Sequence, residues 1–218
     1  SSNPHVRSKV TTNGIMLAVI LALMPATGFG VYHFGIRALA VVCVTIASTV
    51  LTEFLFGLYK KKTTITDLSA VVTGLLLALN LPVSIPLWMA ALGGVFAILV
   101  VKMLFGGLGQ NFMNPALAAR SFPAAMTNFS YDGFTGATPL AVLKSGGEVN
   151  VMDMVLGNTA GTIGETSVIA LVAGACVLIL LGVIDLRIPG SYLLTFVIFM
   201  GIFGGHGFDP AYLTAQLA

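Results

Sequence analysis

Thr138 is the residue in this sequence whose surroundings best suit covalent chemistry. It stands directly before Pro139 and an apolar run at 140–143, a pattern that predicts a helix with threonine as its N-cap and proline at its first position. A phosphate on the threonine hydroxyl would meet free backbone N–H groups and the positive end of the helix dipole. Gly136 and Ala137 add almost no bulk, so a large phosphorylated group could approach closely. On local chemistry alone, a plain helix cap explains Thr138 better than an attached group does.

The composition places the elements around this residue in a lipid bilayer. Of the 218 residues, 57% are hydrophobic and only 8% are charged, and the mean hydropathy is +0.99, which leaves too little polar surface for a water-soluble globule. The apolar runs are apolar on every face, which favours spanning helices over the alternating strands of a membrane barrel. We therefore expect an all-α, polytopic integral membrane protein. Its small positive charge has one cluster, at 60–62, and indicates no nucleic-acid partner.

Basic residues predict how the chain crosses the membrane. Under the positive-inside rule, Arg7, Lys9 and the lysines at 60–62 belong in the cytoplasm, and two intervening spans satisfy this. Lys102 is then expected to snorkel to the cytoplasmic interface, and the loop 127–151 falls on the outer side together with the threonine motif. The expected spans and shorter helical segments are 14–34, 36–58, 63–82, 87–105, 114–123, 152–167, 168–184 and 190–203.

Two segments are too short and too polar to be ordinary lipid-facing spans. Residues 67–82 contain Asp67, Ser69 and Asn80 in an apolar background, residues 153–167 are also rich in polar residues, and a plain span follows each segment. This pattern predicts interrupted half-helices and an internal repeat. Broken helices occur at membrane depth where protein or a cavity satisfies the freed backbone groups. Ordinary hydrogen bonding between helices explains the polar side chains equally well.

Ionisable side chains within these apolar segments are candidates for an ion pathway, because such groups are costly in a membrane and tend to have partners. The candidates are Asp67, Glu53 and Glu165. Glu53 could instead pair with Lys60 on the same helix, and Glu165 suits the first turn of a helix, where the dipole favours a carboxylate. Arg120 lies in a helix of small residues between two prolines. It could meet a phosphate or an anionic reduced flavin, or form an interfacial salt bridge.

The cysteines and histidines show no pattern of a metal site. Cys43 and Cys176 are isolated in apolar runs and no C-x-x-C occurs, so we expect no iron–sulfur cluster held by this chain. His5, His33 and His206 lie far apart without helical ligand spacing, which gives no indication of haem or zinc. Cys43 could contact a cofactor bound between subunits, although its role as a small hydrophobe explains it as well.

The segment Asp132-x-x-Thr135-Gly136-Ala137-Thr138 resembles the flavinylation motif of membrane redox subunits, which carry FMN through a phosphoester on the last threonine. The resemblance extends over essentially the whole chain. Segments 3–7, 66–76, 112–116 and 164–167 look like those of RnfD, a membrane component of the Rnf complex. The RnfD family is related to NqrB of the sodium-pumping NADH:quinone oxidoreductase.

This resemblance implies a multi-pass subunit of a bacterial or archaeal inner-membrane machine that passes electrons between reduced ferredoxin and NAD while moving sodium ions or protons. It implies FMN on Thr138, with Asp132, Thr135, Gly136 and Ala137 recognised by the flavin transferase. It also implies a second, non-covalent riboflavin, and partner subunits that include another FMN carrier and iron–sulfur proteins.

Members of the family have further C-terminal spans. We therefore expect residues 1–218 to form one transmembrane domain that is incomplete at its C-terminus. The polar half-helices also suit a rival interpretation, a membrane channel or secondary transporter without a redox cofactor. A subunit that only positions others is a further alternative.

Overall fold

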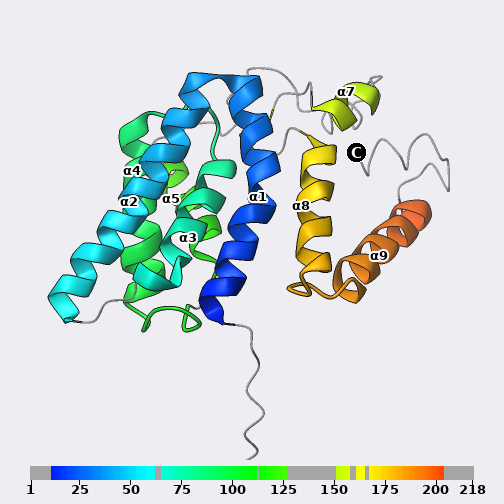
Figure 1. The fold of residues 1–218 in the computed structure, drawn as a ribbon. Helices are drawn as coiled ribbons and strands as arrows, with labels where there is room; N and C mark the ends of the chain where they lie inside the picture. Colours follow the sequence, from blue (N-terminus) through cyan, green and yellow to red (C-terminus); the bar gives the residue numbers. More distant parts are fainter. Residues whose placement is uncertain are drawn as a thin grey trace, which may run out of the picture.

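The computed structural model describes residues 11–61, 65–111, 113–126, 151–157, 161–164 and 167–203. Within these ranges the chain is helical and contains no strand, which confirms the all-α prediction (Figure 1). The helices are α1 (Thr12–Phe34), α2 (Ile36–Lys60), η1 (Ile65–Asp67), α3 (Ser69–Leu79), α4 (Leu87–Phe96), η2 (Ala97–Met103), α5 (Pro115–Met126), α7 (Val151–Leu156), α8 (Val168–Leu180) and α9 (Arg187–Phe203).

Helices α1 and α2 are long and apolar enough to cross a membrane. They have 23 and 25 residues, and a helix of about 20 residues spans the hydrocarbon core of a bilayer. The turn between them is made by Gly35, whose φ of 75° lies in the region that favours glycine. This single residue allows α2 to return antiparallel to α1, as the expected spans 14–34 and 36–58 require.

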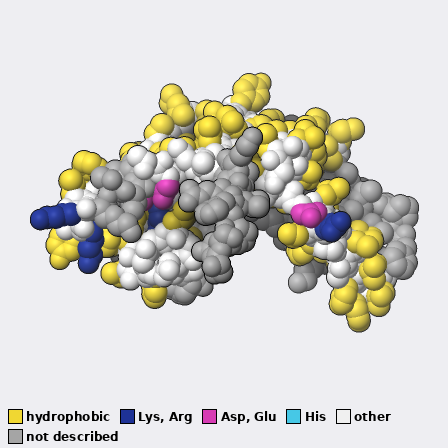
Figure 2. Space-filling model, turned by 60° about the horizontal axis from the view of Figure 1, so that its bottom comes forward, with side chains coloured by type: hydrophobic (Ala, Val, Ile, Leu, Met, Phe, Trp, Pro, Cys, Tyr) yellow, Lys and Arg dark blue, Asp and Glu magenta, His cyan; other side chains and the backbone are white. Residues whose placement is uncertain are grey.

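The ends of these helices divide the molecule into two sides. The start of α1, the end of α2 and the turn between α8 and α9 lie at the same end of the molecule, whereas α7 and the start of α8 lie at the opposite end (Figure 1). Figure 2 shows the first of these ends, with basic side chains at one edge and hydrophobic side chains over much of the described surface. The described helix ends that adjoin the predicted cytoplasmic segments therefore lie on one side.

Helix α3 is an interrupted half-helix, as the sequence predicts for this segment. It has 11 residues and is therefore about 16 Å long, roughly half of a bilayer core. Beyond its end, the segment 161–164 lies against it: the Gly164 amide donates to the Leu79 carbonyl at 2.9 Å and the Ile163 amide to the Leu81 carbonyl at 3.3 Å. These bonds satisfy backbone groups where the helix is broken. The two segments that the sequence pairs as a repeat are thus in contact.

Helix α8 is shorter than predicted. The sequence suggested a full span over 168–184, but the helix ends at Leu180 after 13 residues. Gly182, at a φ of 68°, follows the end, and the Val183 amide donates back to the Leu178 carbonyl at 2.9 Å. A glycine in this conformation with such a bond is a common way to terminate a helix. Hydropathy did not reveal this stop because the residues beyond it are also apolar.

Small residues allow α1 to approach its neighbours closely. Its buried residues Ala18, Ala22, Ala26 and Gly30 repeat every four positions and so lie on one face. A Cβ at Gly174 of α8 would collide with the Ala22 carbonyl oxygen, and one at Gly30 would collide with the Ile163 carbonyl oxygen. Close packing of small residues is typical of helix contacts in membranes, where burial in lipid gives little driving force of its own.

This contact gives a prediction with a matched control in the same helix. Gly30→Ala should destabilise the protein by about 1–3 kcal/mol, because the new methyl group meets backbone that cannot easily move. Gly28→Ala should not destabilise it, since nothing lies within 4 Å of a Cβ at that position. Thermal unfolding of the purified membrane complex would compare the two variants. Equal stabilities would mean that the segment 161–164 does not lie against α1.

Candidate functional site

A fully buried ion pair joins α2 to η2. The Glu53 side chain is 0% exposed and the Lys102 side chain 2%, and Lys102 Nζ lies 2.7 Å from Glu53 Oε2. Both groups come from otherwise apolar helices, so each compensates a charge that would be very costly alone. Two interpretations of the sequence are therefore wrong. Lys102 does not snorkel to the interface, and the partner of Glu53 is not Lys60.

The backbone of η2 explains why the lysine points inward. Residues Ala97–Met103 form a π-helix, and the Leu104 amide donates to the Leu99 carbonyl five residues earlier. A π-helical turn holds more residues than an α-helical one, so the side chains that follow are rotated from the positions that 3.6 periodicity predicts. Such turns are rare and often occur at functional sites.

Ser69 and Asp67 extend the pair into a chain of hydrogen bonds. Lys102 Nζ donates to Ser69 Oγ at 2.5 Å, and Ser69 Oγ donates to Asp67 Oδ1 at 2.5 Å. The same Asp67 oxygen accepts the Ser69 backbone amide at 2.9 Å, so Asp67 also caps the first turn of α3. We call Glu53, Lys102, Ser69 and Asp67 the Lys102 cluster. It joins two of the three predicted ion-pathway residues.

The cluster holds more negative than positive groups. It contains the two carboxyl groups of Glu53 and Asp67 and the one ammonium group of Lys102. Glu53 Oε1 is buried and has no hydrogen-bond partner among the described residues. A buried carboxylate oxygen without a partner is costly, because it has lost its water without receiving another donor. The cluster therefore has unused capacity to bind a proton or a cation.

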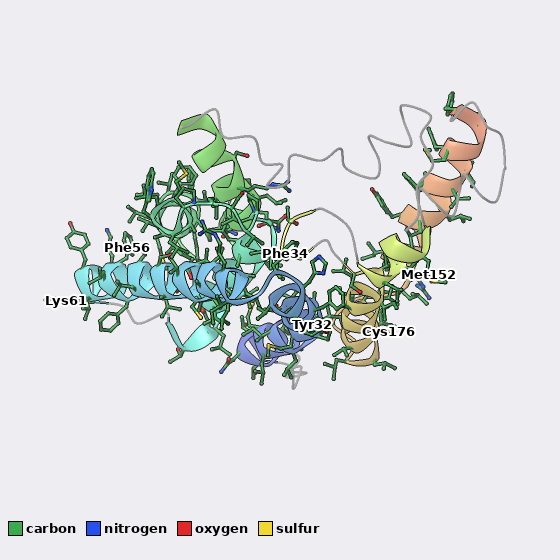
Figure 3. The ribbon with its side chains drawn as sticks, turned by 90° about the horizontal axis from the view of Figure 1, so that it is seen from above. Tyr32, Phe34, Phe56, Lys61, Met152 and Cys176 are labelled. Carbon is green, nitrogen blue, oxygen red and sulfur yellow. The ribbon has the colours of Figure 1, made fainter. Side chains whose placement is uncertain are left out.

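A cavity of about 360 Å³ lies toward the end of α2, and none of its lining residues is a member of the Lys102 cluster. Its lining residues are Phe56, Gly57, Lys60, Met103, Leu104, Gly106 and Gly107. Gly57 is one helical turn beyond Glu53, and Met103 directly follows Lys102. Glu53 precedes Lys60 by seven residues, about 10 Å along the helix axis. Figure 3 shows Phe56 and Lys61 toward the C-terminal end of α2, far from Tyr32 and Phe34 at the turn between α1 and α2.

Arg120 lies at the other end of α3. Its NH1 group donates to Asn80 Oδ1 at 3.4 Å, and Asn80 Nδ2 donates to the Leu76 carbonyl at 2.8 Å. Asn114 caps α5, since its Oδ1 accepts the Ala116 amide at 3.0 Å, and Pro115 is the first helical residue. The cap fixes where α5 begins and so places Arg120 beside the broken end of α3.

The remaining predicted site residues lie outside the described residues: Asp132, Thr135, Gly136, Ala137, Thr138 and Glu165. The described elements that flank the threonine motif are α5, which ends at Met126, and α7, which begins at Val151. Cys43 and Cys176 are exposed free cysteines on α2 and α8 (Figure 3 labels Cys176). In the part of the chain that the structure describes, no group of three or more His, Cys, Asp or Glu side chains could hold a metal ion.

Sequence reasoning missed Lys102 and Ser69 as members of the cluster. The available signal was a lone lysine inside an apolar run. Like a lone carboxylate there, it is costly in a membrane and therefore indicates a partner. Periodicity could not identify its partner, because Glu53 and Ser69 are 49 and 33 residues away in the sequence.

Comparison with known proteins relates the whole chain to one family. The model of the NQR2, RnfD, RnfE family matches residues 1–217. A protein of Acetobacterium woodii, named as the D subunit of a Na⁺-translocating ferredoxin:NAD⁺ oxidoreductase complex, is 49% identical, over 94% of this chain and 69% of its own length. A Clostridium ljungdahlii protein, named as the D subunit of a proton-translocating complex, is 43% identical over 94% of this chain and 69% of its own length. The B subunit of the Na⁺-translocating NADH-quinone reductase of Pseudomonas aeruginosa is 41% identical over 62% of this chain and 38% of its own length.

Proposed function

This chain belongs to the NQR2, RnfD, RnfE family, and from that premise we propose that it is the membrane electron-transfer subunit of an ion-pumping ferredoxin:NAD oxidoreductase. The observation that carries the proposal is the similarity to the D subunits of two such complexes over 94% of the chain. The family is membrane-associated, and its named members are subunits of redox-driven translocases. The other subunits of the complex are its partners, among them a second FMN carrier and iron–sulfur proteins.

In this proposal, Thr138 carries FMN through a phosphoester. The motif around Thr138 supports this, together with the helix that the sequence predicts to begin at Pro139, whose free N–H groups would stabilise the phosphate. A flavin accepts two electrons and releases them singly, which suits a relay between one-electron clusters and nicotinamide. The phosphoester bond to Thr138 prevents loss of the FMN to the medium. Arg120 is a candidate partner for a phosphate or a reduced flavin, and a non-covalent riboflavin is a second proposed cofactor.

The arrangement of the helices supports an outer location of the flavin segment in an inner-membrane protein. Helix α7, which follows the segment directly, lies at the end of the molecule opposite the basic end of α2 (Figure 1). Because lysine and arginine concentrate in cytoplasmic segments, the end that carries Lys60 and Lys61 is assigned to the cytoplasm. Thr138 is then on the outer face, where electrons would pass between subunits.

The ion pathway is proposed to include Glu53, Asp67 and Glu165. For Glu53 and Asp67 the support is structural, since both belong to the Lys102 cluster, in which Glu53 is fully buried and has a carboxylate oxygen without a partner among the described residues. The relatives do not indicate which cation moves. One is named for sodium and another for protons at similar identity to this chain.

Ion uptake by vesicles tests the whole proposal. Inside-out membrane vesicles that contain the complete complex should take up sodium ions or protons when reduced ferredoxin and NAD⁺ are supplied. Glu53→Gln should lower this uptake by about tenfold or more, because a neutral amide cannot replace the carboxylate charge. Glu148→Gln is the matched control, since Glu148 lies in the loop predicted to be outside the spans. Uptake would be followed with radioactive sodium and a pH-sensitive dye.

The alternative is a channel or secondary transporter without a redox cofactor. The broken helix α3 and its contact with the segment 161–164 favour it, because such interruptions are typical of transporters. The same vesicles distinguish the two. Ion movement that proceeds at full rate without the electron donor would support the transporter and exclude the redox proposal.

A further inference from the structure

Lys102 is positioned between two carboxyl groups. Its ammonium group donates to Glu53 Oε2 at 2.7 Å and to Ser69 Oγ at 2.5 Å. The serine hydroxyl in turn donates to Asp67 Oδ1. One carboxyl group is therefore in direct contact with the lysine, and the second is separated from it by a single hydroxyl group.

A static ion pair does not require this arrangement. One carboxylate neutralises one ammonium group, and further buried charge adds desolvation cost without adding attraction. Here Asp67 supplies a second negative group, while Glu53 Oε1 remains buried with no partner among the described residues. The cluster has one positive charge for two negative groups, so it can accept one more monovalent cation without becoming positive.

We propose that Lys102 is an exchangeable counter-cation. An entering monovalent cation, either a sodium ion or a proton, binds the Glu53 carboxylate in place of the Lys102 ammonium group, which then pairs with Asp67 beside Ser69. The inference rests on the proposed function only in that a cation reaches Glu53. No bond to carbon forms or breaks, and the charge of the cluster rises by one for each cation taken up.

The geometry allows this exchange. The lysine stem is flexible, and its ammonium group can rotate its three donors among acceptors. The Asp67 side chain is less buried than that of Glu53, so an ion pair with Lys102 there carries a lower desolvation cost. The cavity lined by Gly57 and Met103 lies at the basic end of α2 and comes to within about one helical turn of Glu53 along the helix.

Few other charges face the cluster. On the described parts of the elements packed around it, the remaining charged groups are Lys60, Lys61, Arg37 and Arg120. Lys60 borders the cavity and contacts the rings of Phe56 and Tyr59. Both arginines lie far from the cluster, Arg37 at the start of α2 and Arg120 at the far end of α3 against Asn80. The exchange is therefore between the entering cation and Lys102.

Two substitutions should act in opposite directions. Lys102→Met removes the competitor, so the half-saturating cation concentration should fall by about tenfold or more. Asp67→Asn removes the charge that receives Lys102 while keeping an oxygen to cap α3, so the half-saturating concentration should rise several-fold. If Lys102 and Asp67 had only a structural role, the two substitutions would not shift the half-saturating cation concentration in opposite directions.

The measurement uses the complete complex in proteoliposomes. The rate of electron transfer from reduced ferredoxin to NAD⁺ would be followed against sodium concentration at fixed pH, with choline keeping ionic strength constant, and against pH at fixed sodium. The first series identifies sodium as the exchanging cation and the second the proton. Melting temperatures in the same buffers give a second readout that needs no electron transfer, and Lys61→Met is the control for replacing a lysine.

Unchanged half-saturating concentrations in both variants would overturn the exchange. If the complex with Lys102→Met fails to assemble, Asp67→Asn alone tests the proposal. It should raise the half-saturating cation concentration, and an unaltered concentration contradicts the proposal. A wild-type complex that pumps without saturable dependence on either cation would also overturn the exchange while leaving the proposed function intact. If wild-type vesicles take up neither ion, the proposed function fails, and the melting temperatures still decide on the exchange.

Discussion

Thr138→Ala should leave this chain with no covalently bound flavin. A phosphoester needs the side-chain oxygen, and alanine has none, so the expected effect is complete loss rather than a reduction. Native protein from a host with the flavin transferase should give a fluorescent band after denaturing electrophoresis, and the variant should give none. Intact-mass analysis should show the wild-type chain heavier than its sequence by one FMN phosphoester. Electron transfer by the complex should fall with the flavin.

A second threonine provides the control for this result. Thr127 lies in the same undescribed stretch but outside the motif, so Thr127→Ala should keep the flavin and the fluorescence. Unmodified Thr138 in mature protein from a host with the transferase would overturn the attachment. The outer location can be tested separately. A cysteine placed at Ser145 that reacts with an impermeant reagent only from the cytoplasm would exclude it.

Removing one member of the buried ion pair should destabilise the protein strongly. Lys102→Met leaves the Glu53 carboxylate buried without a counter-charge, which typically costs about 3–5 kcal/mol. The double substitution Glu53→Gln with Lys102→Met removes both charges and should recover most of this loss. Chemical denaturation of the detergent-solubilised complex would measure the free energies for a double-mutant cycle.

The control for this cycle is Lys61→Met, which replaces an exposed lysine directly after the end of α2. It should change stability by less than about 0.5 kcal/mol. Additive effects of the two single substitutions at Glu53 and Lys102 would mean that the groups do not interact. If a cation can take the place of Lys102, the loss in Lys102→Met should be smaller in sodium than in choline.

The sequence predicted the long helices well because their signals are local. The spans 14–34 and 36–58 correspond to α1 and α2 within a few residues, since Gly35 separates two apolar runs and lysines follow the second. The short α3 was also predicted, from its polar residues and the prolines after it. The end of α8 was not, because it depends on the backbone conformation of Gly182 inside an apolar stretch.

The candidate site was predicted only in part, for a physical reason. Glu53 and Asp67 are costly groups in an apolar sequence, and that cost alone marks them. Their connection through Lys102 depends on a π-helical turn and on contacts between residues far apart in the chain. Neither leaves a periodic signal. The roles of Thr138 and Glu165 remain predictions from the motif and from helix-end chemistry.

The burial of Lys102 also bears on how the chain enters the membrane during synthesis. A lysine at the centre of an inserting helix costs about 2.5–3.5 kcal/mol, and Lys102, in the last turn of η2, would incur part of this cost if it entered the membrane without a partner. Glu53 precedes Lys102 by 49 residues, so its carboxyl group has already left the ribosome when the lysine emerges. Because α2 is synthesised first, Glu53 is available to pair with Lys102 when the segment that contains η2 enters the membrane.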